Sequence, residues 1–68
     1  MVVKVNGEER TLNQGATVLD LLGAMAIEPS PKGLAVAVNG ELAPRAEWGE
    51  QRLAEGDAVE VLRPMQGG

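Results

Sequence analysis

Two Asn-Gly dipeptides, Asn6-Gly7 and Asn39-Gly40, constrain the fold of this chain more than any other feature. Asn-Gly is the strongest two-residue signal for a β-hairpin, because a type I′ turn needs a positive φ at both central residues. Each dipeptide follows a short run rich in valine, residues 1–5 and 34–39, as expected for a strand. The sequence therefore predicts two hairpins. Their return strands are residues 8–12 and 41–44.

One long helix is predicted between the two hairpins. Thr17 can serve as its N-cap, with Asp20 as an acidic residue in the first turn. The apolar stripe that follows has helical spacing and consists of Val18, Leu21, Leu22 and Met25. The helix should end within residues 25–28, because the loop at residues 29–33 contains two prolines that cannot continue it.

The remaining segments complete the expected architecture. They are an irregular or one-turn segment at residues 45–52 around Trp48, a turn at residues 55–57 and a last strand at residues 58–63. Pro64 should end that strand, because proline cannot extend a central ladder. The expected fold class is α+β, with one helix across a mixed sheet of four to five strands. The expected domain is residues 1–63, followed by a flexible tail at residues 64–68.

Composition excludes most kinds of catalytic site. The 68 residues include no cysteine and no histidine, and the one serine, Ser30, lies in the proline-containing loop. A thiol nucleophile, a Ser/His triad and a cysteine-ligated zinc site are therefore impossible. A chain this short is also not expected to enclose a deep cavity. We expect no enzyme activity, no metal site and no cofactor bound by this chain.

Charge points to a protein partner. The net charge of −4, from six Lys and Arg against ten Asp and Glu, disfavours binding to nucleic acid or to anionic lipid. A partner protein with a basic surface fits it better. Met1 leads directly into the first predicted strand without a signal peptide, and no apolar run approaches the ~18 residues of a membrane span. The expected location is the cytoplasm.

The uncovered face of the predicted sheet is one candidate site, because a single helix can cover only one face. In the strand at residues 34–39, bulky side chains alternate with two alanines, which should lie on the uncovered face. The apolar or small residues expected there are Val2, Ala35, Ala37, Ala58 and Leu62. They either form a docking surface or sit beneath loops, and the sequence leaves both interpretations open.

The terminal Gly67-Gly68 is the other candidate site, and it is either a frayed end or a functional terminus. Two glycines form a thin strip of backbone that can enter a narrow channel. An ionised carboxylate is a poor electrophile at neutral pH, so a partner would have to activate it, for example as an acyl-adenylate made with ATP. A sulfur donor that displaces AMP would leave a thiocarboxylate. Residues 64–68 could reach roughly 16–18 Å from the sheet.

Five segments form a combination that is more specific than any of them alone. They are Val36-Ala37-Val38-Asn39-Gly40, Pro44-Arg45 with Trp48, Leu53-Ala54-Glu55-Gly56-Asp57, Val59-Glu60-Val61 and Gly67-Gly68. Together they resemble the ThiS family of sulfur carrier proteins in thiamine biosynthesis. The resemblance implies a ubiquitin-like β-grasp fold and adenylation by a ThiF-type enzyme that uses ATP and Mg²⁺. It further implies sulfur from a cysteine desulfurase system, conversion of the terminus to a thiocarboxylate, and sulfur delivery to thiazole synthase, ThiG.

The resemblance also assigns roles to residues of the tail. It places the modified glycine at Gly68 and the penultimate glycine at Gly67. Met65 and Gln66 stand where the tail would meet its partners, and methionine suits an adaptable apolar contact.

Arg45 and Trp48 belong to a P-R-x-x-W pattern of the family. Arg45 would pair with acidic groups of a partner. Trp48 is better explained as a packing anchor, because the chain has no other aromatic residue. The predicted partner-binding residues are Ala35, Ala37, Arg45, Leu62 and Met65.

Related small proteins share the fold and the Gly-Gly end. They include the small subunit of molybdopterin synthase, which is usually longer and fits the P-R-x-x-W segment poorly. They also include carriers for tRNA thiolation or cysteine synthesis. A ubiquitin-like modifier that joins Gly68 to lysines, and a plain interaction module, are the alternatives from other functional classes.

Overall fold

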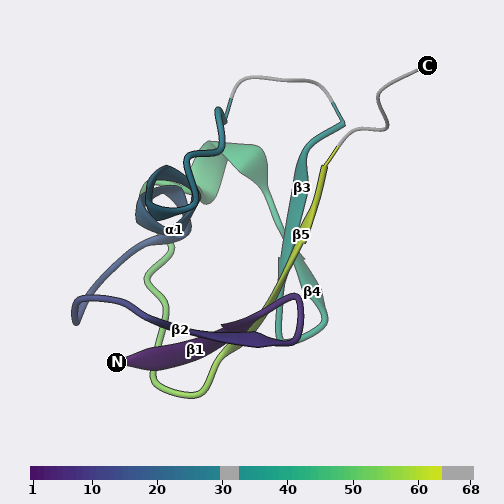
Figure 1. The fold of residues 1–68 in the computed structure, drawn as a ribbon. Helices are drawn as coiled ribbons and strands as arrows, with labels where there is room; N and C mark the ends of the chain where they lie inside the picture. The colour runs from purple at the N-terminus through teal and green to yellow at the C-terminus, as the bar shows by residue number, and fades with distance from the viewer. Residues whose placement is uncertain (30–32, 64–68) are drawn as a thin grey trace.

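The computed structural model describes residues 1–29 and 33–63. The described residues form one mixed sheet with one α-helix packed on one side of it (Figure 1). The elements are β1 (Val2–Val5), β2 (Glu8–Thr11), α1 (Val18–Ala24), β3 (Ala35–Val38), β4 (Glu41–Ala43), the 3₁₀ helix η1 (Arg45–Glu47) and β5 (Ala58–Leu62). The strands lie in the order β2-β1-β5-β3-β4. The predicted α+β class, the mixed sheet and the one-turn segment after β4 are confirmed.

The last strand, β5, lies at the centre of the sheet between the two predicted hairpins. It pairs in parallel with β1 and antiparallel with β3. The hairpins themselves are the antiparallel pairs β1–β2 and β3–β4. The strand that leads into the predicted tail is therefore held on both sides.

Both Asn-Gly turns have the predicted conformation, with φ of 52° at Asn6 and at Asn39 and positive φ at the glycines that follow. Each asparagine side chain also bonds to the β5 region. The Asn6 amide donates to the Val61 carbonyl at 3.2 Å, and its oxygen accepts from the Val61 N–H at 2.9 Å. The Asn39 amide donates to Asp57 at 3.0 Å, and its oxygen accepts from the Ala58 N–H at 3.0 Å. The two turns thus fix β5 from both hairpins.

The start of α1 agrees with the prediction. The Thr17 hydroxyl accepts from the Asp20 N–H at 3.1 Å, and the Asp20 carboxylate accepts from the Thr17 N–H at 2.9 Å. The Val18 N–H donates to the Gln51 carbonyl and the Leu19 N–H to the carbonyl at position 48. The first donors of the helix, which have no partners within the helix, are therefore satisfied by its cap and by tertiary bonds.

Thr17→Ala removes half of this reciprocal cap and leaves the Asp20 N–H without its acceptor. We expect the free energy of unfolding to fall by about 0.5–2 kcal/mol. That is a large share for a domain of this size. Urea unfolding followed by circular dichroism measures the change. Thr17→Ser keeps the hydroxyl and is the control; equal midpoints for the two variants would show that the cap contributes nothing.

The end of α1 differs from the prediction. Ala24 is the last helical residue and Met25 is the C-cap, so the predicted end at residues 25–28 is too late. Ala26 adopts a left-handed conformation with φ of 57°, and the N–H groups of Ala26 and Ile27 donate back into the last turn at 3.0 and 2.9 Å. This type of closure usually has glycine at the left-handed position. Alanine there gives no sequence signal for the end of the helix.

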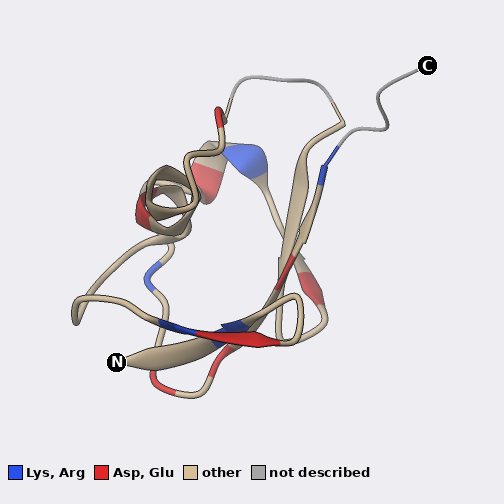
Figure 2. Ribbon diagram, in the orientation of Figure 1, with Lys and Arg blue, Asp and Glu red and all other residues tan. Residues whose placement is uncertain are grey.

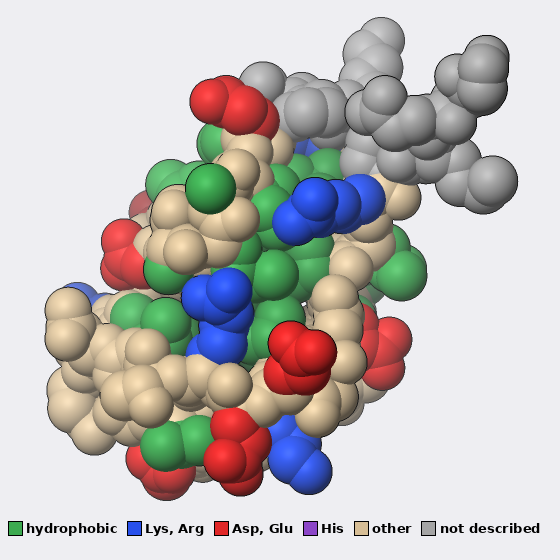
Figure 3. All heavy atoms as spheres, in the orientation of Figure 1, with side chains coloured by type: hydrophobic (Ala, Val, Ile, Leu, Met, Phe, Trp, Pro, Cys, Tyr) green, Lys and Arg blue, Asp and Glu red, His purple; other side chains and the backbone are tan. Residues whose placement is uncertain are grey.

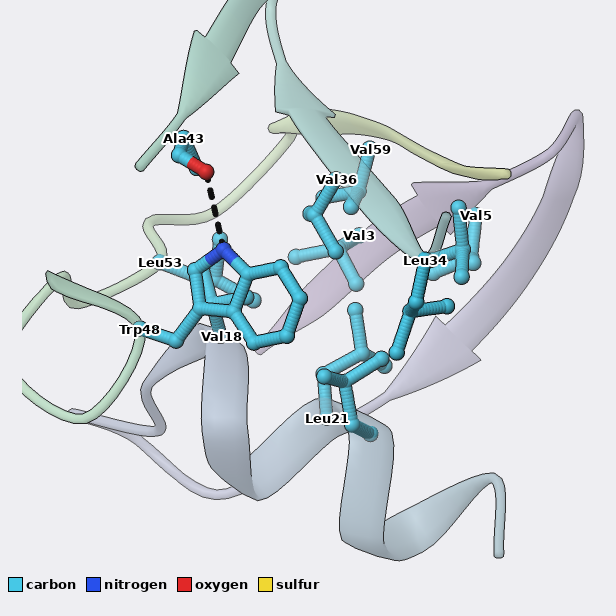
Figure 4. Close-up of a cluster of buried hydrophobic side chains, with 12 residues drawn as sticks. Val3, Val5, Val18, Leu21, Leu34, Val36, Ala43, Trp48, Leu53 and Val59 are labelled. Carbon is cyan, nitrogen blue, oxygen red and sulfur yellow. Dashed lines mark hydrogen bonds between the residues drawn. The ribbon is translucent and has the colours of Figure 1, made fainter. Parts of the chain in front are cut away.

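The core lies between α1 and the sheet. Trp48 is 2% exposed, and its Nε1 donates to the Ala43 carbonyl at 2.9 Å (Figure 4). Its predicted role as a packing anchor is confirmed. Met25 and Val38, predicted on the buried faces of their elements, pack partly buried against this core. The buried side chains are Val3, Val5, Val18, Leu21, Leu22, Leu34, Val36, Ala43, Trp48, Leu53, Val59 and Val61.

Candidate functional site

The strand register builds the uncovered face of the sheet from alternate residues. Alternate valines of β3 and β5 are buried beneath α1, so the residues between them point to the opposite side. Ala35 pairs with Leu62, and Ala37 pairs with Glu60 on one side and Leu42 on the other. The predicted partner-binding residues of β3 and β5 are therefore neighbours on this face.

Three of the predicted residues, Ala35, Ala37 and Leu62, form a contiguous surface with Leu42, and we call these four residues the apolar patch. Leu42 is 71% exposed and Leu62 is 59% exposed. Single exposed leucines are common, whereas adjoining exposed apolar residues make this surface a candidate docking site. Viewed from the side in Figure 3, hydrophobic side chains lie between α1 and the sheet and also on the side of the sheet away from α1.

Leu42 is the member of the apolar patch that the sequence analysis missed. A two-residue turn at Asn39-Gly40 sets Val38 opposite Glu41, and the next pair is then Ala37 with Leu42. The register set by the turn is therefore enough to predict that Leu42 lies beside Ala37 on the uncovered face.

The rest of the uncovered face is less apolar than predicted. Val2 is partly buried and Ala58 is exposed on this face, but Lys4 and Glu60 lie among them. Alternation along a strand also explains the two charged residues. Lys4 is two positions from Val2 on β1, and Glu60 is two positions from Ala58 on β5, so each pair shares one face. The apolar part of the face is thus confined to β3, β4 and the end of β5.

Arg45 has an intramolecular role that the sequence does not reveal. Its guanidinium donates to the carbonyls of Pro29 and Leu34, the latter at 3.1 Å. It also lies over the Trp48 ring, 4.7 Å from the ring centroid. These contacts join η1 to the segment just before β3, which pairs with the end of β5. Arg45 therefore supports the part of the sheet beside the tail exit, and its pairing with a partner stays a prediction.

The predicted tail residues Met65, Gln66, Gly67 and Gly68 lie outside the described residues, and so does the predicted tail segment as a whole. The described chain ends at Arg63, directly after β5 and beside the apolar patch. Figure 2 shows basic residues on η1 and at this end of β5, and acidic residues on β2, β4 and β5. The chain thus enters the predicted tail next to an exposed apolar surface.

Other kinds of site find no support in residues 1–29 and 33–63. No group of three or more histidine, cysteine or carboxylate side chains in these ranges could hold a metal ion. No helix in the same part of the chain has the length and apolar character needed to cross a membrane. The apolar patch and the tail remain the candidates for function.

Known proteins similar to this chain include sulfur carriers. Residues 3–68 match the model of the ThiS family. The sulfur carrier protein ThiS of Thermus thermophilus is 42% identical over 67 residues, which cover 98% of this chain and 100% of that protein. A thiazole synthase of Paramagnetospirillum magneticum is 31% identical over 68 residues, which cover 100% of this chain and 20% of that protein.

Solved structures agree with the sequence matches. The crystal structure of the thiamine biosynthesis protein ThiS from Geobacter metallireducens has a TM-score of 0.80, 33% identity and full coverage of both chains. A solution structure of a thiamine biosynthesis protein from the same organism gives the same score and identity and covers 88% of that chain. This chain therefore belongs to the ThiS family, the sulfur carrier proteins of thiamine biosynthesis, and has their ubiquitin-like β-grasp fold.

Proposed function

We propose that the Gly68 carboxyl group carries sulfur as a thiocarboxylate for thiazole formation in thiamine biosynthesis. The observation that carries this proposal is the match to the ThiS family over residues 3–68, which extends through the terminal Gly67-Gly68. The sequence has no cysteine or histidine, which supports the terminus as the group that holds sulfur.

In the proposed cycle, a ThiF-type enzyme adenylates the terminus. A carboxylate oxygen of Gly68 attacks the α-phosphorus of ATP, and pyrophosphate leaves while Mg²⁺ in that enzyme binds phosphate oxygens. A thiol reductant releases hydrosulfide from the persulfide of a cysteine desulfurase system and is itself oxidised to a disulfide; the hydrosulfide then attacks the acyl carbon, and AMP leaves. Gly68 keeps the sulfur as a thiocarboxylate. This chain supplies the group that reacts, and its partners supply the catalytic groups.

The proposed acceptor of the sulfur is a thiazole synthase of the ThiG type. In the thiazole synthase that matches this chain, the matching segment makes up 20% of the length of the enzyme. A carrier-like segment within the polypeptide of such an enzyme supports direct transfer between the two, because covalent linkage raises the effective concentration of the carrier.

The apolar patch is the proposed docking surface, since it adjoins the tail exit. We expect Leu62→Glu to weaken binding to the adenylating enzyme and to thiazole synthase by about 1–3 kcal/mol, because the new carboxylate would lose water without gaining a partner. The fold should persist, because Leu62 is exposed. Titration calorimetry measures the affinities. Ala24→Glu, at the exposed end of α1, is the control. Equal affinities for Leu62→Glu and wild type would remove the patch from the interface.

Deletion of the gene from its host tests the proposed pathway. The mutant should require thiamine or its thiazole part for growth, and the full-length gene should remove that requirement. A gene truncated after Gly67 should not. Molybdenum cofactor, thiolated tRNA and cysteine should form normally in the mutant. A mutant that grows without thiamine would contradict the proposed pathway. A mutant that instead fails in one of those three processes would assign the chain to a related carrier.

A further inference from the structure

Glu60 places a carboxylate at the centre of the uncovered sheet face. It lies on the central strand β5, pairs with Ala37 of the apolar patch, and precedes Leu62 by two residues. It is exposed, and its carboxylate makes no hydrogen bond or ion pair with any other residue that the structure describes. A charged group facing water thus adjoins an exposed apolar surface.

Lys4 is on the same face but does not neutralise Glu60. The register sets Lys4 opposite Glu9 on β2 and opposite Ala58 on β5. No ion pair joins it to Glu60 in the described part of the chain. A partner that covers the apolar patch therefore meets the Glu60 carboxylate with its charge intact.

This charge restricts what can cover the patch. A purely apolar partner surface would remove water from the carboxylate without replacing its hydrogen bonds, which is strongly unfavourable. A Lys or Arg of the partner would compensate for the lost water through a charge-assisted hydrogen bond. A two-fold contact between the same faces of two copies of this chain would instead bring two Glu60 carboxylates together, between molecules that each carry a net charge of −4.

We propose that Glu60 determines partner specificity on this face. It forms an ion pair with a Lys or Arg of a different protein, whose surrounding surface is apolar and covers Leu42 and Leu62. This proposal rests on the proposed function, in which an enzyme must hold the chain beside its tail exit. The net negative charge accelerates the encounter with a basic partner surface, and the Glu60 ion pair sets the orientation of the docked chain.

Adenylation kinetics with the host's ThiF-type enzyme test the ion pair. Glu60→Gln keeps the size of the side chain and removes its charge. We expect the KM for this chain to rise on the order of tenfold with kcat little changed, because the lost interaction lies outside the reacting atoms. The salt dependence of kcat/KM should weaken as well. Glu50→Gln removes the same charge from the segment that contacts the start of α1, and it should behave as wild type.

Leu42→Ala tests the apolar part of the contact, with Leu19→Ala on the exposed side of α1 as its control. We expect the KM for Leu42→Ala to rise and the KM for Leu19→Ala to stay at the wild-type value. Equal KM values for Glu60→Gln and Glu50→Gln, with wild type fully adenylated, would overturn this proposal and leave the proposed function standing. A wild-type chain that is not adenylated would overturn both. A wild-type dimer that Leu42→Ala converts to a monomer in sedimentation would assign the face to self-association and overturn this proposal.

Discussion

Deletion of Gly68 is expected to reduce adenylation and thiocarboxylate formation about 100-fold or more. The shortened chain still ends in a glycine carboxylate, but its tail is shorter by about 3.3–3.6 Å. A misplacement of about 1 Å can already cost about 100-fold in rate. The free energy of unfolding should not change, because the described core and β5 end before the deleted residue. Pyrophosphate release and urea midpoints measure the two quantities.

Gly68→Ala is the matched control for the deletion. It keeps the length of the tail and adds one methyl group, so its effect reports how narrow the partner's channel is. We expect a loss of rate smaller than that of the deletion. Adenylation of the deletion variant at the wild-type rate would show that the position of the Gly68 carboxyl group is not what the enzyme recognises.

Trp48→Ala is expected to remove a large share of the free energy of unfolding. Replacing a buried tryptophan by alanine costs about 3–5 kcal/mol, whereas the total stability expected for 68 residues is roughly 3–10 kcal/mol. Trp48 is buried between α1 and the end of β4, and its Nε1 bonds to the Ala43 carbonyl. Arg45 also packs over its ring. Circular dichroism and urea unfolding measure the loss.

Trp48→Phe separates the ring from the hydrogen bond. Phenylalanine fills much of the same space but loses the Nε1 hydrogen bond to the Ala43 carbonyl, for which we expect a loss of about 0.5–1.5 kcal/mol. Trp48→Ala should therefore have a clearly lower urea midpoint than Trp48→Phe. Wild-type midpoints for both variants would contradict the role of Trp48 as the anchor of this core.

The parts of the fold that local sequence specifies were predictable. Asn6-Gly7 and Asn39-Gly40 demand positive φ, and they fix the turns and registers of the two hairpins. Thr17 with Asp20 marks the start of α1, because a hydroxyl and a carboxylate at that spacing satisfy each other's N–H groups.

Features that depend on contacts between distant segments were not predictable. No local signal places β5 between β1 and β3, since that order arises from burying the valines of three strands under one helix. The side-chain bonds from Asn6 to Val61 and the contacts of Arg45 likewise join segments far apart in the sequence. The end of α1 was missed for a local reason, because Ala26 occupies a position where glycine is the usual signal.

The candidate site also has parts that the sequence predicts and parts that need the strand pairing. Alternation along β3 and β5 was enough to place Ala35, Ala37 and Leu62 on one face, and the turn register could have added Leu42. Alternation along β5 also places Glu60 on this face beside Leu62, but its position opposite Ala37 needs the β3–β5 pairing. The roles of Met65, Gln66, Gly67 and Gly68 rest on the sequence and on membership of the ThiS family.

Intact mass of the chain after incubation with the host's adenylating enzyme, ATP, Mg²⁺, cysteine desulfurase, cysteine and a thiol reductant is the most direct measurement of sulfur carriage. The expected product has sulfur in place of one oxygen, and fragmentation should locate it on the C-terminal peptide that ends in Gly68. The chain without Gly68, treated identically, should keep its original mass. An unchanged mass for the full-length chain, sulfur at another position, or conjugates of higher mass in its place would contradict a thiocarboxylate carrier.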